Sequence, residues 1–322
     1  MIAAVYENYG APEVLQLKEV AQPIPDRHEI LVKIQASAVS SGDVRLRKAD
    51  PFAVRFFFGL FRPKHRVLGG VLAGEVVAIG EAVTKFKVGD AVFGTTGLSF
   101  GGYAEYKNLA EAGVLAKMPA DFSYEQAAAI PFGGTTALHF IKKARLQPGQ
   151  KVLIYGASGA VGSAAVQLAK HFGAQVTGVC STANLAMVKS LGADKVVDYT
   201  TTDFSQSGEQ YDVVFDTVNK APYSSLLKVL AKNGLLLLGA AGPAEMFRAL
   251  WTSLTSKQKV ITGMISETAA DMEFLAQLME RGRLKASIDK TYPLDQIAEA
   301  HRYVDGGHKK GNVVIKISGV FN

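Results

Sequence analysis

The chain has 322 residues, of which 48% are hydrophobic, so it can bury a large core and we expect two globular domains. A single cysteine excludes an intramolecular disulfide framework and fits a reducing cytoplasm. The net charge of +6 is spread along the chain without a Lys/Arg tract or interleaved aromatic residues, so nucleic-acid binding is not expected.

The hydropathy of the chain bears on its location. The first residues, Met1–Glu7, contain no basic region followed by an apolar run, so no secretory signal is expected. No apolar stretch approaches the roughly 20 residues that a membrane-spanning helix needs. We therefore expect a soluble, cytoplasmic protein.

Residues 1–121 have the pattern of an all-β domain. Short runs of β-forming residues are broken there by Gly, Pro and Asp. The runs are Glu29–Ala36, Gly74–Ile79, Ala91–Phe93 and Gly102–Lys107.

Residues 50–67 interleave five phenylalanines with five basic side chains. Pro51 and Pro63 bracket the aromatic run, so a short helix or loop is expected rather than a strand. Two interpretations follow from the residues themselves. Either the rings pack into the core of the first domain, or they lie at a membrane interface with the basic side chains on anionic lipid.

Val152–Gly162 reads as an apolar strand, a turn punctuated by glycine and the start of a helix. Gly156 permits the sharp turn, Gly159 lets the backbone approach a pyrophosphate, and Gly162 lets the helix pack closely on the sheet. The helix would direct its N-terminal N–H groups and dipole at the phosphates. A tight turn without a ligand is the alternative. The residues expected to bind a dinucleotide are Gly156, Ala157, Ser158, Gly159, Ala160, Val161 and Gly162.

The end of the second strand of this domain indicates which nicotinamide nucleotide binds. An NAD site places an Asp or Glu about 20 residues after the first glycine, where it holds the ribose hydroxyls. No carboxylate occurs from residue 126 to residue 193, so nothing there repels a 2′-phosphate. Ser181, Asn184 and Tyr199 can donate hydrogen bonds to that phosphate, and we predict NADPH. The alternative is that Ser181 and Asn184 simply cap a helix.

Further strands alternate with helical or loop stretches, which is the pattern of a doubly wound parallel sheet and hence of an α/β fold. They are expected at Gln175–Val179, Lys195–Tyr199, Tyr211–Asp216, Gly234–Gly239 and Lys259–Met264. Leu294–Val304 has a helical pattern. The strand Asn312–Ile317 does not continue the alternation, so we expect it to return to the first domain. The expected division is 1–121 with 288–322, and 122–287.

Taken together, several segments resemble the medium-chain dehydrogenase/reductase superfamily, and within it the zinc-free quinone-oxidoreductase branch. The resemblance extends over essentially the whole chain. The segments that carry it are Tyr9–Leu15, Leu72–Gly80, Phe86–Gly94, Gly102–Tyr106, Ala127–Pro131 and the glycine turn. It implies a Rossmann domain, a GroES-like β-rich substrate domain completed by the carboxy-terminal strand, an active site in the cleft between the two, and a homodimer.

Zinc-dependent members of the superfamily carry a cysteine in the turn that matches Val39–Asp43 and a Gly-His-Glu before the strand at Gly74. The matching positions here are Ser40, Gly70 and Val71. A zinc site needs thiolate and imidazole ligands about 2.0–2.3 Å from the ion, and this sequence does not supply that set. We therefore expect no metal.

Without a metal as Lewis acid, hydride delivery suits carbon atoms that are already electrophilic, as in quinones and α,β-unsaturated carbonyls. Quinone reductases of this branch show Asn-Pro-x-Asp/Glu followed by a tyrosine, where this chain has Ser40, Ser41, Asp43 and Arg45. We predict that Ser40 and Arg45 contact the substrate carbonyl and that Asp43 orients Arg45 or the turn. The alternative is that Arg45 is a solvated charge.

The resemblance also implies further cofactor contacts. Thr136 matches a threonine near the nicotinamide, although it could equally start a helix. Asn312 belongs to a late segment that reaches the cofactor in the family. Other candidates end successive strands, where a doubly wound sheet binds ligands. They are Thr217, Val218, Gly239, Ala240, Met264, Ile265 and Ser266.

In the family, the stretch that matches residues 50–67 lies over the cleft. We therefore predict that Phe56, Phe57 or Phe58 forms an apolar wall or lid for the substrate. The overall prediction is an NADPH-dependent, zinc-independent reductase of quinones or α,β-unsaturated carbonyls. Two other classes stay open: a low-turnover NADPH-binding protein with a sensor, structural or RNA-binding role, and an oxidoreductase associated with a membrane surface.

Overall fold

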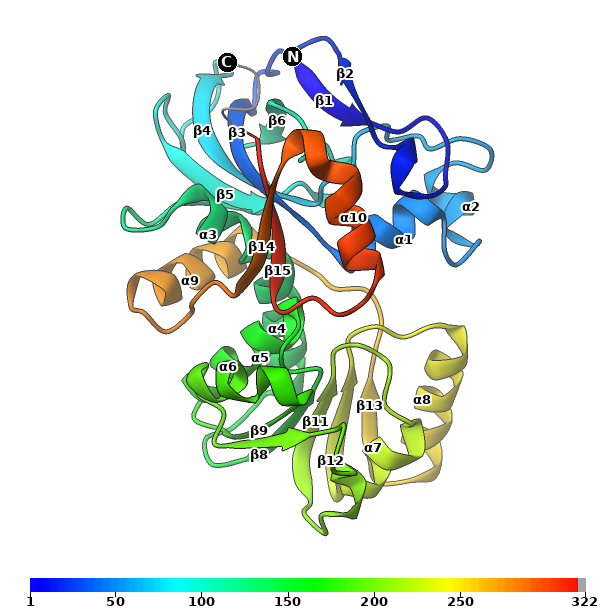
Figure 1. Ribbon diagram of the computed structural model, residues 1–322. Helices are drawn as coiled ribbons and strands as arrows, with labels where there is room; N and C mark the ends of the chain where they lie inside the picture. Colours follow the sequence, from blue (N-terminus) through cyan, green and yellow to red (C-terminus); the bar gives the residue numbers. More distant parts are fainter. Residues whose placement is uncertain (318–322) are drawn as a thin grey trace. The chain divides into compact units, whose positions relative to one another are not determined.

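The computed structural model of the protein describes residues 1–317, which form two compact units. Among these residues, unit 1 contains 1–132, 268–280 and 286–317, and unit 2 contains 133–267 and 281–285. Each unit has its own sheet (Figure 1). Each also has its own hydrophobic core. In the described part of the chain, no helix is both long and apolar enough to cross a membrane.

Unit 1 is built on a seven-stranded, mostly antiparallel sheet. Its order is β14 (Ile288–Pro293), β15 (Asn312–Lys316), β3 (Glu29–Val39), β4 (Val71–Ile79), β5 (Ala91–Thr95) and β7 (Leu115–Lys117), and β6 (Tyr106–Ala110) also pairs with β3. A separate two-stranded sheet joins β1 (Ile2–Val5) to β2 (Gln16–Glu19). The first domain is therefore rich in β-strands, as expected, but it is not all-β, because helices also occur within it.

Short helices complete unit 1. Helix α1 (Ser41–Lys48) begins with a capping box, in which the Ser40 hydroxyl accepts from the Asp43 N–H and the Asp43 carboxylate accepts from the Ser40 N–H. The other helices are α2 (Val54–Phe58), α3 (Tyr124–Ala128), α9 (Ala269–Glu280) and α10 (Ile297–Asp305), with 3₁₀ turns at Pro12–Val14, Gly97–Ser99 and Leu294–Gln296. Apolar residues of α10 pack into the same core as the strands.

The carboxy-terminal strand confirms the expectation that it returns to the first domain. β15 pairs antiparallel with β3, where Val313 lies opposite Val39, and parallel with β14. It therefore lies inside the sheet rather than at its edge. Its Val313, Val314 and Ile315 side chains are all fully buried. Because successive side chains of a strand point to opposite faces, both faces of β15 are covered.

Unit 2 is a doubly wound parallel sheet of six strands, as predicted. The order is β10 (Lys195–Asp198), β9 (Gln175–Cys180), β8 (Lys151–Tyr155), β11 (Tyr211–Asp216), β12 (Leu230–Leu238) and β13 (Lys259–Ile261). The direction of winding reverses between β8 and β11, which creates a crevice at their carboxyl ends where such sheets bind ligands. β12 begins earlier than expected, and β13 ends earlier.

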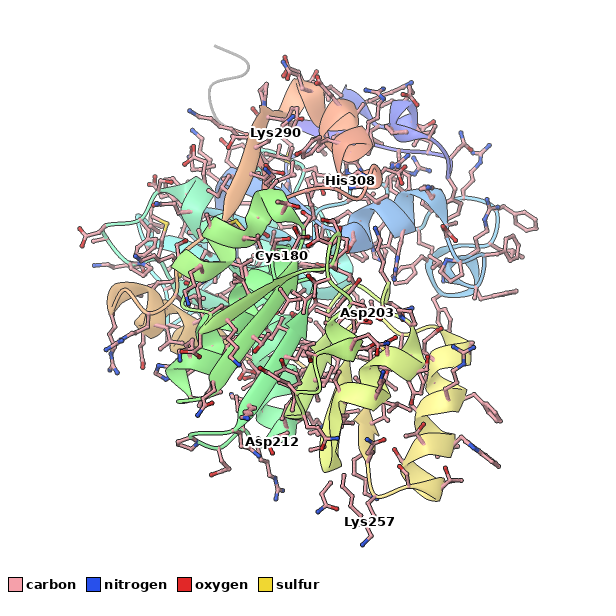
Figure 2. The ribbon with its side chains drawn as sticks, turned by 60° about the horizontal axis from the view of Figure 1, so that its bottom comes forward. Cys180, Asp203, Asp212, Lys257, Lys290 and His308 are labelled. Carbon is pink, nitrogen blue, oxygen red and sulfur yellow. The ribbon has the colours of Figure 1, made fainter. Side chains whose placement is uncertain are left out.

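The helices of unit 2 connect these strands. They are α4 (Pro131–Ala144), α5 (Ala160–His171), α6 (Leu185–Ser190), α7 (Tyr223–Val229) and α8 (Pro243–Thr255), with 3₁₀ turns at Thr182–Asn184 and Phe204–Gln206. In Figure 2, Cys180 marks the carboxyl end of β9, whereas Asp212 and Lys257 lie at the opposite edge of the sheet.

The division of the chain differs from the expected boundaries at 121/122 and 287/288. The compact units divide after Phe132, within the first turn of α4. Helix α9 belongs to unit 1, and the short segment 281–285 after it belongs to unit 2. Sequence patterns mark helices and strands, but the unit on which a connecting helix packs is decided by tertiary contacts.

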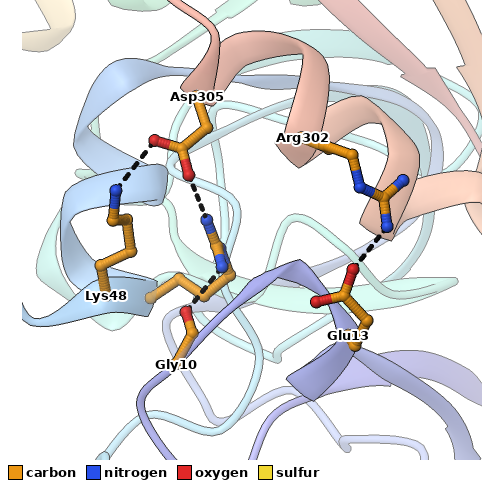
Figure 3. Close-up of polar contacts among 6 residues, drawn as sticks. Gly10, Glu13, Lys48, Arg302 and Asp305 are labelled. Atoms are coloured by element: carbon orange, nitrogen blue, oxygen red, sulfur yellow. Dashed lines mark hydrogen bonds and ion pairs between the residues drawn. The ribbon is translucent and has the colours of Figure 1, made fainter.

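Arg47 ties three segments of unit 1 together from a fully buried position. Its Nη1 donates to the Gly10 carbonyl at 2.6 Å, and its Nη2 lies 3.3 Å from Asp305 Oδ2. Lys48 holds the other Asp305 oxygen at 3.0 Å. Figure 3 shows these contacts beside an ion pair between exposed side chains, Arg302 and Glu13.

We expect Arg47→Met to lower the free energy of unfolding by about 2 kcal/mol, because it leaves the Gly10 carbonyl and Asp305 without a buried partner. Arg302→Met breaks a solvent-screened pair and is expected to leave stability nearly unchanged. Chemical denaturation of both variants measures the difference. Equal effects would contradict the bridging role of Arg47.

Candidate functional site

The glycine turn of unit 2 has the geometry of a phosphate cradle. Gly156 adopts a φ of +79°, and a Cβ placed on it would lie 2.8 Å from Thr217 Oγ1. A Cβ on Gly162 would lie 2.1 Å from the Gly156 carbonyl oxygen. A Cβ on Gly159 would meet that oxygen at 3.5 Å and nothing closer. The first and third glycines are therefore required by packing within the protein, whereas the second leaves space for a ligand.

Helix α5 begins at this turn with its first N–H groups available. Gly159 is the N-cap residue and has no side chain to bond them. Their orientation and the helix dipole favour an anion at this position. Helix α4 packs against the same point, since a Cβ on Gly133 would lie 2.3 Å from the Ala160 carbonyl oxygen. Thr136 is buried in the second turn of α4, so the structure brings its helix next to the turn.

Asn184 joins the glycine turn to the end of β9. Its side chain is 7% exposed, and its Nδ2 donates to Ser158 Oγ at 3.2 Å and to Ser181 Oγ at 3.1 Å. Because both hydroxyls accept from Asn184, their own protons remain available for an external acceptor. Within residues 1–317, Asn184 Oδ1 is buried without a hydrogen-bond partner. Ser181 and Asn184 stand at the N-cap positions of the 3₁₀ turn Thr182–Asn184 and of α6, but neither side chain makes a cap hydrogen bond.

A carboxylate missed by the sequence analysis approaches this cluster from the neighbouring strand. Asp198 ends β10, where it pairs with Cys180 of β9, and it accepts a hydrogen bond from the Thr182 hydroxyl. Bonds from Thr182 and Thr200 lower the pKa of Asp198, so it is ionised at neutral pH. The feature of the sequence that could have identified Asp198 is its place at the end of the neighbouring strand, β10, rather than at the end of β9. Tyr199, beside it, is 50% exposed.

Cys180 lies at the end of β9 and is buried. Burial, with a smaller effect from the Asp198 charge, raises the pKa of its thiol to about 11. A thiol in this state is a packed residue and not a nucleophile.

The other side of the crevice is fixed by the end of β11. The Thr217 hydroxyl donates to the Tyr155 carbonyl at 2.9 Å, which links β11 to β8. Asp216 is 1% exposed, and its Oδ1 accepts from the N–H groups of Val218 and Asn219 at 3.0 and 2.9 Å. Burial raises the pKa of Asp216.

The Gly239 N–H donates to the Asp216 carbonyl at 2.9 Å. Ala240 directly follows Gly239 and is half-buried. The predicted residues Thr217, Val218, Gly239 and Ala240 are thus gathered at this carboxyl edge.

The segment Met264–Ser266 is held to α4. The Ser266 N–H lies 3.1 Å from His139 Nδ1, and Glu267 accepts a hydrogen bond from the Thr135 hydroxyl. His139, Thr135 and Glu267 were not identified from the sequence, because nothing local links residues so distant in the chain. Met264 itself is 88% exposed.

Asn312 belongs to unit 1, unlike the other predicted cofactor residues. Its backbone N–H and its Nδ2 both donate to the Ser287 carbonyl, at 2.8 and 3.1 Å. The structure thus assigns Asn312 a role in joining β15 to the chain before β14. Its contact with a cofactor stays a prediction.

The turn at Ser40 is organised around the buried Asp43 carboxylate. The Ser40 hydroxyl donates to Asp43 Oδ2 at 2.6 Å, and the Gly69 N–H donates to Asp43 Oδ1 at 3.2 Å. Burial raises the pKa of Asp43, while the bonds from Ser40 and Gly69 oppose that rise. Asp43 therefore orients the turn, one of its two expected roles. Arg45 is exposed on α1, and the proposed carbonyl contact by Ser40 would require its hydroxyl to leave Asp43.

The aromatic segment forms the short helix α2, as expected, but most of its rings are not in a core. Phe56 is 67% exposed and Phe57 76%. Phe52 and Phe61 are also exposed, so the core interpretation is wrong for these four rings. Phe58 is half-buried and packs edge-on against Phe100, with 5.9 Å between the ring centroids.

In the described chain, no group of three or more His, Cys, Asp or Glu side chains is arranged to hold a metal ion. The fit to a dinucleotide is better supported. It combines an open Gly159, the unbonded start of α5, and two hydroxyls directed outward by Asn184.

Two family models match this chain. Residues 26–120 match the alcohol dehydrogenase GroES-like domain, and residues 191–315 match a zinc-binding dehydrogenase domain. The chain is 35% identical to a chloroplastic quinone oxidoreductase, QR1, of Triphysaria versicolor, with 98% of each protein covered. It is 31% identical to a chloroplastic NADPH-dependent alkenal/one oxidoreductase of Arabidopsis thaliana, covering 98% of this chain and 79% of that one. The quinone oxidoreductase of Coxiella burnetii superposes with a TM-score of 0.89 at 26% identity, covering 98% and 99% of the two chains.

Substitution of two glycines separates packing from ligand binding. Gly162→Ala forces a Cβ against the Gly156 carbonyl, so we expect it to cost about 1–3 kcal/mol of stability. Gly159→Ala fits the protein but fills the space left for a phosphate. We expect it to keep the melting temperature within a few degrees and to weaken nicotinamide dinucleotide binding at least roughly tenfold, about 1.4 kcal/mol.

Thermal denaturation and titration calorimetry measure the two effects. Unchanged dinucleotide affinity in a folded Gly159→Ala protein would show that the ligand lies elsewhere.

Proposed function

Because this chain belongs to the medium-chain dehydrogenase/reductase superfamily, in its quinone-oxidoreductase-like branch, we propose that it is a zinc-independent reductase using NADPH on quinones or α,β-unsaturated carbonyls. It is an oxidoreductase. The observation that carries the proposal is the Asn184 cluster beside the glycine turn, which offers two hydroxyl protons to a phosphate next to an unbonded helix start.

The residues of unit 2 would hold the nucleotide along the crevice. The turn around Gly159 would receive the pyrophosphate, and the carboxyl ends of β11 and β12 would border the nicotinamide half. When bound, the nicotinamide would supply a hydride. Thr136 is proposed to contact that half from α4, and Ser266, fixed by His139, to border it.

The choice of NADPH rests on charge and hydrogen bonding at the end of β9. Ser158 and Ser181 supply hydroxyl donors for a 2′-phosphate, and Tyr199 supplies a third. Asp198 opposes this with a negative charge, but the hydroxyls of Thr182 and Thr200 already bond its two oxygens. The hydroxyl donors outweigh the charge of Asp198, so NADPH is favoured. The preference is smaller than the absence of an acid on β9 alone would give.

Metal independence rests on the residues that stand at the zinc-ligand positions of related enzymes. Ser40 and Gly70 offer neither thiolate nor imidazole. The substrate carbonyl must then be polarised by hydrogen-bond donors, which suits substrates that are already electrophilic. We propose Arg45 as the cationic donor, and Ser40 as a second donor when its hydroxyl turns from Asp43.

Phe56, Phe57 and Phe58 are proposed to give the substrate an apolar wall. The exposure of Phe56 and Phe57 means that they can meet a ligand, while Phe58 is anchored on Phe100. The same exposure supports a second candidate role, contact with a membrane surface. Arg62, Lys64 and Arg66 are also exposed beside these rings and would suit anionic lipid.

We also propose a homodimer located in the cytoplasm. Helix α8 carries an exposed apolar stripe whose Phe247 and Trp251 are 69% and 63% exposed. Apolar patches of this kind mark interaction surfaces. Helix α8 contacts β13, the edge strand of its sheet, so we propose apolar packing by α8 and strand pairing by β13 as contacts with a second copy.

The proposed function is tested by following NADPH oxidation over a panel of quinones, enones and enals, before and after prolonged chelation. We expect turnover with members of the panel and no loss of rate after chelation. Simple alcohols with NADP⁺ serve as the control, because a bound zinc ion would act as the Lewis acid in their oxidation. Alcohol oxidation that chelation abolishes would contradict zinc independence, and no turnover on any member would favour a low-turnover binding role.

Cofactor preference is a separate prediction. The native protein is expected to prefer NADPH over NADH at least roughly tenfold in kcat/KM, about 1.4 kcal/mol, from two or three hydrogen bonds to the 2′-phosphate. Ser181→Asp should erase or reverse the preference, and Asp198→Asn should increase it by removing the opposing charge. Steady-state kinetics with both nucleotides measure these ratios. Equal kcat/KM for NADPH and NADH in the native protein would contradict the predicted preference.

A further inference from the structure

Unit 2 contains a wide basic groove that is distinct from the dinucleotide turn. Its volume is about 960 Å³, and it is lined by the end of α5, the end of α6 and the segment 281–285. The dinucleotide turn is at the other end of α5. Ala160 at the turn and Lys170 in the groove are ten residues apart along α5, about 15 Å at the rise of an α-helix.

The fold gathers basic side chains here from two separate parts of the sequence. Lys170 and His171 come from α5, and Arg281, Arg283 and Lys285 from the later segment. The nearness of the two groups is visible in His171, whose pKa is lowered first by burial and then by the charges of Arg283 and Arg281. Positive charge that is spread along the sequence is therefore concentrated at one place in the folded protein.

Most of this positive charge is not neutralised by the protein. Lys170 is paired with Asp194, whose carboxylate oxygens lie 2.9 and 2.8 Å from its Nζ. Across residues 1–317, no carboxylate forms an ion pair with Arg281, Arg283 or Lys285. Three cations at one groove repel each other unless an anion lies between them.

The groove is also held in shape by a buried side chain. Gln167 is 6% exposed, and its Oε1 accepts from the Lys285 N–H at 2.8 Å while its Nε2 donates to the Lys285 carbonyl at 3.1 Å. Leu284, next to it, is 1% exposed. The segment 281–285 is thus fixed against α5, so its charges are presented from a defined backbone.

We propose that this groove binds a compact anion carrying several phosphate groups. Arginine guanidinium groups match phosphate oxygens in a bidentate manner, and Lys285 adds a point charge. The groove is lined by no Phe, Tyr or Trp side chain in the described chain, so it offers no platform on which nucleic-acid bases would stack. A soluble oligophosphate and a phosphoinositide headgroup share the chemistry that it recognises.

Inorganic tripolyphosphate is the probe, titrated by calorimetry in the presence of saturating NADP⁺ so that the dinucleotide turn is occupied. The double variant Arg281→Gln, Arg283→Gln is expected to bind at least tenfold more weakly than the native protein. The matched control is Lys257→Gln, Lys259→Gln, which removes the same charge from exposed residues of unit 2 and should bind like the native protein. Circular dichroism verifies that all variants are folded.

The outcomes separate the sources of the anion. Binding lost in the arginine variant and kept in the control supports the proposal, and stronger retention on phosphoinositide vesicles than on phosphatidylcholine vesicles identifies a lipid headgroup as the source. Binding that survives in the arginine variant, an equal loss in the control, or no heat of binding in the native protein would overturn it. So would capture of single-stranded RNA without tripolyphosphate competition.

Discussion

The close approach of α5 to the turn after β8 is the constraint on which the rest of unit 2 depends. Gly162 lies so near the Gly156 carbonyl that a residue with a Cβ does not fit at this position. This contact fixes the direction of α5, and the start of α4 then packs on Ala160 through Gly133. Ser158 in the same turn reaches Asn184, so the position of one helix sets both the phosphate cradle and the cluster at the end of β9.

The parts of this arrangement that are determined by short stretches of sequence could be predicted. The spacing of the glycines predicted the turn, and apolar runs predicted most strands of the parallel sheet. The broken alternation at Asn312 predicted a strand that returns to the first domain. These features follow from φ/ψ freedom and from burial, which each short segment carries in its own residues.

Contacts between segments could not be predicted in the same way. Asp198 lies beside Cys180 because β10 and β9 pair in parallel. The residues of β9 alone do not indicate that this carboxylate is near. The bond between Thr135 and Glu267 and the one between Asp43 and Gly69 join residues far apart in the chain. The exposure of Phe56 and Phe57 is also a tertiary property, since phenylalanines interleaved with basic side chains are also compatible with packing into a core.

The position of β15 has a consequence for how the protein is made. β15 lies between β14 and β3 inside the unit 1 sheet, yet the ribosome produces it after all of unit 2. Until then, β3 has an open edge on the side that β15 will cover, with unpaired N–H and C=O groups. Unit 2 can assemble most of its sheet earlier, because β8 to β13 are consecutive. The sheet of unit 1 is therefore completed last, and until β15 is made its open edge exposes the nascent chain to aggregation.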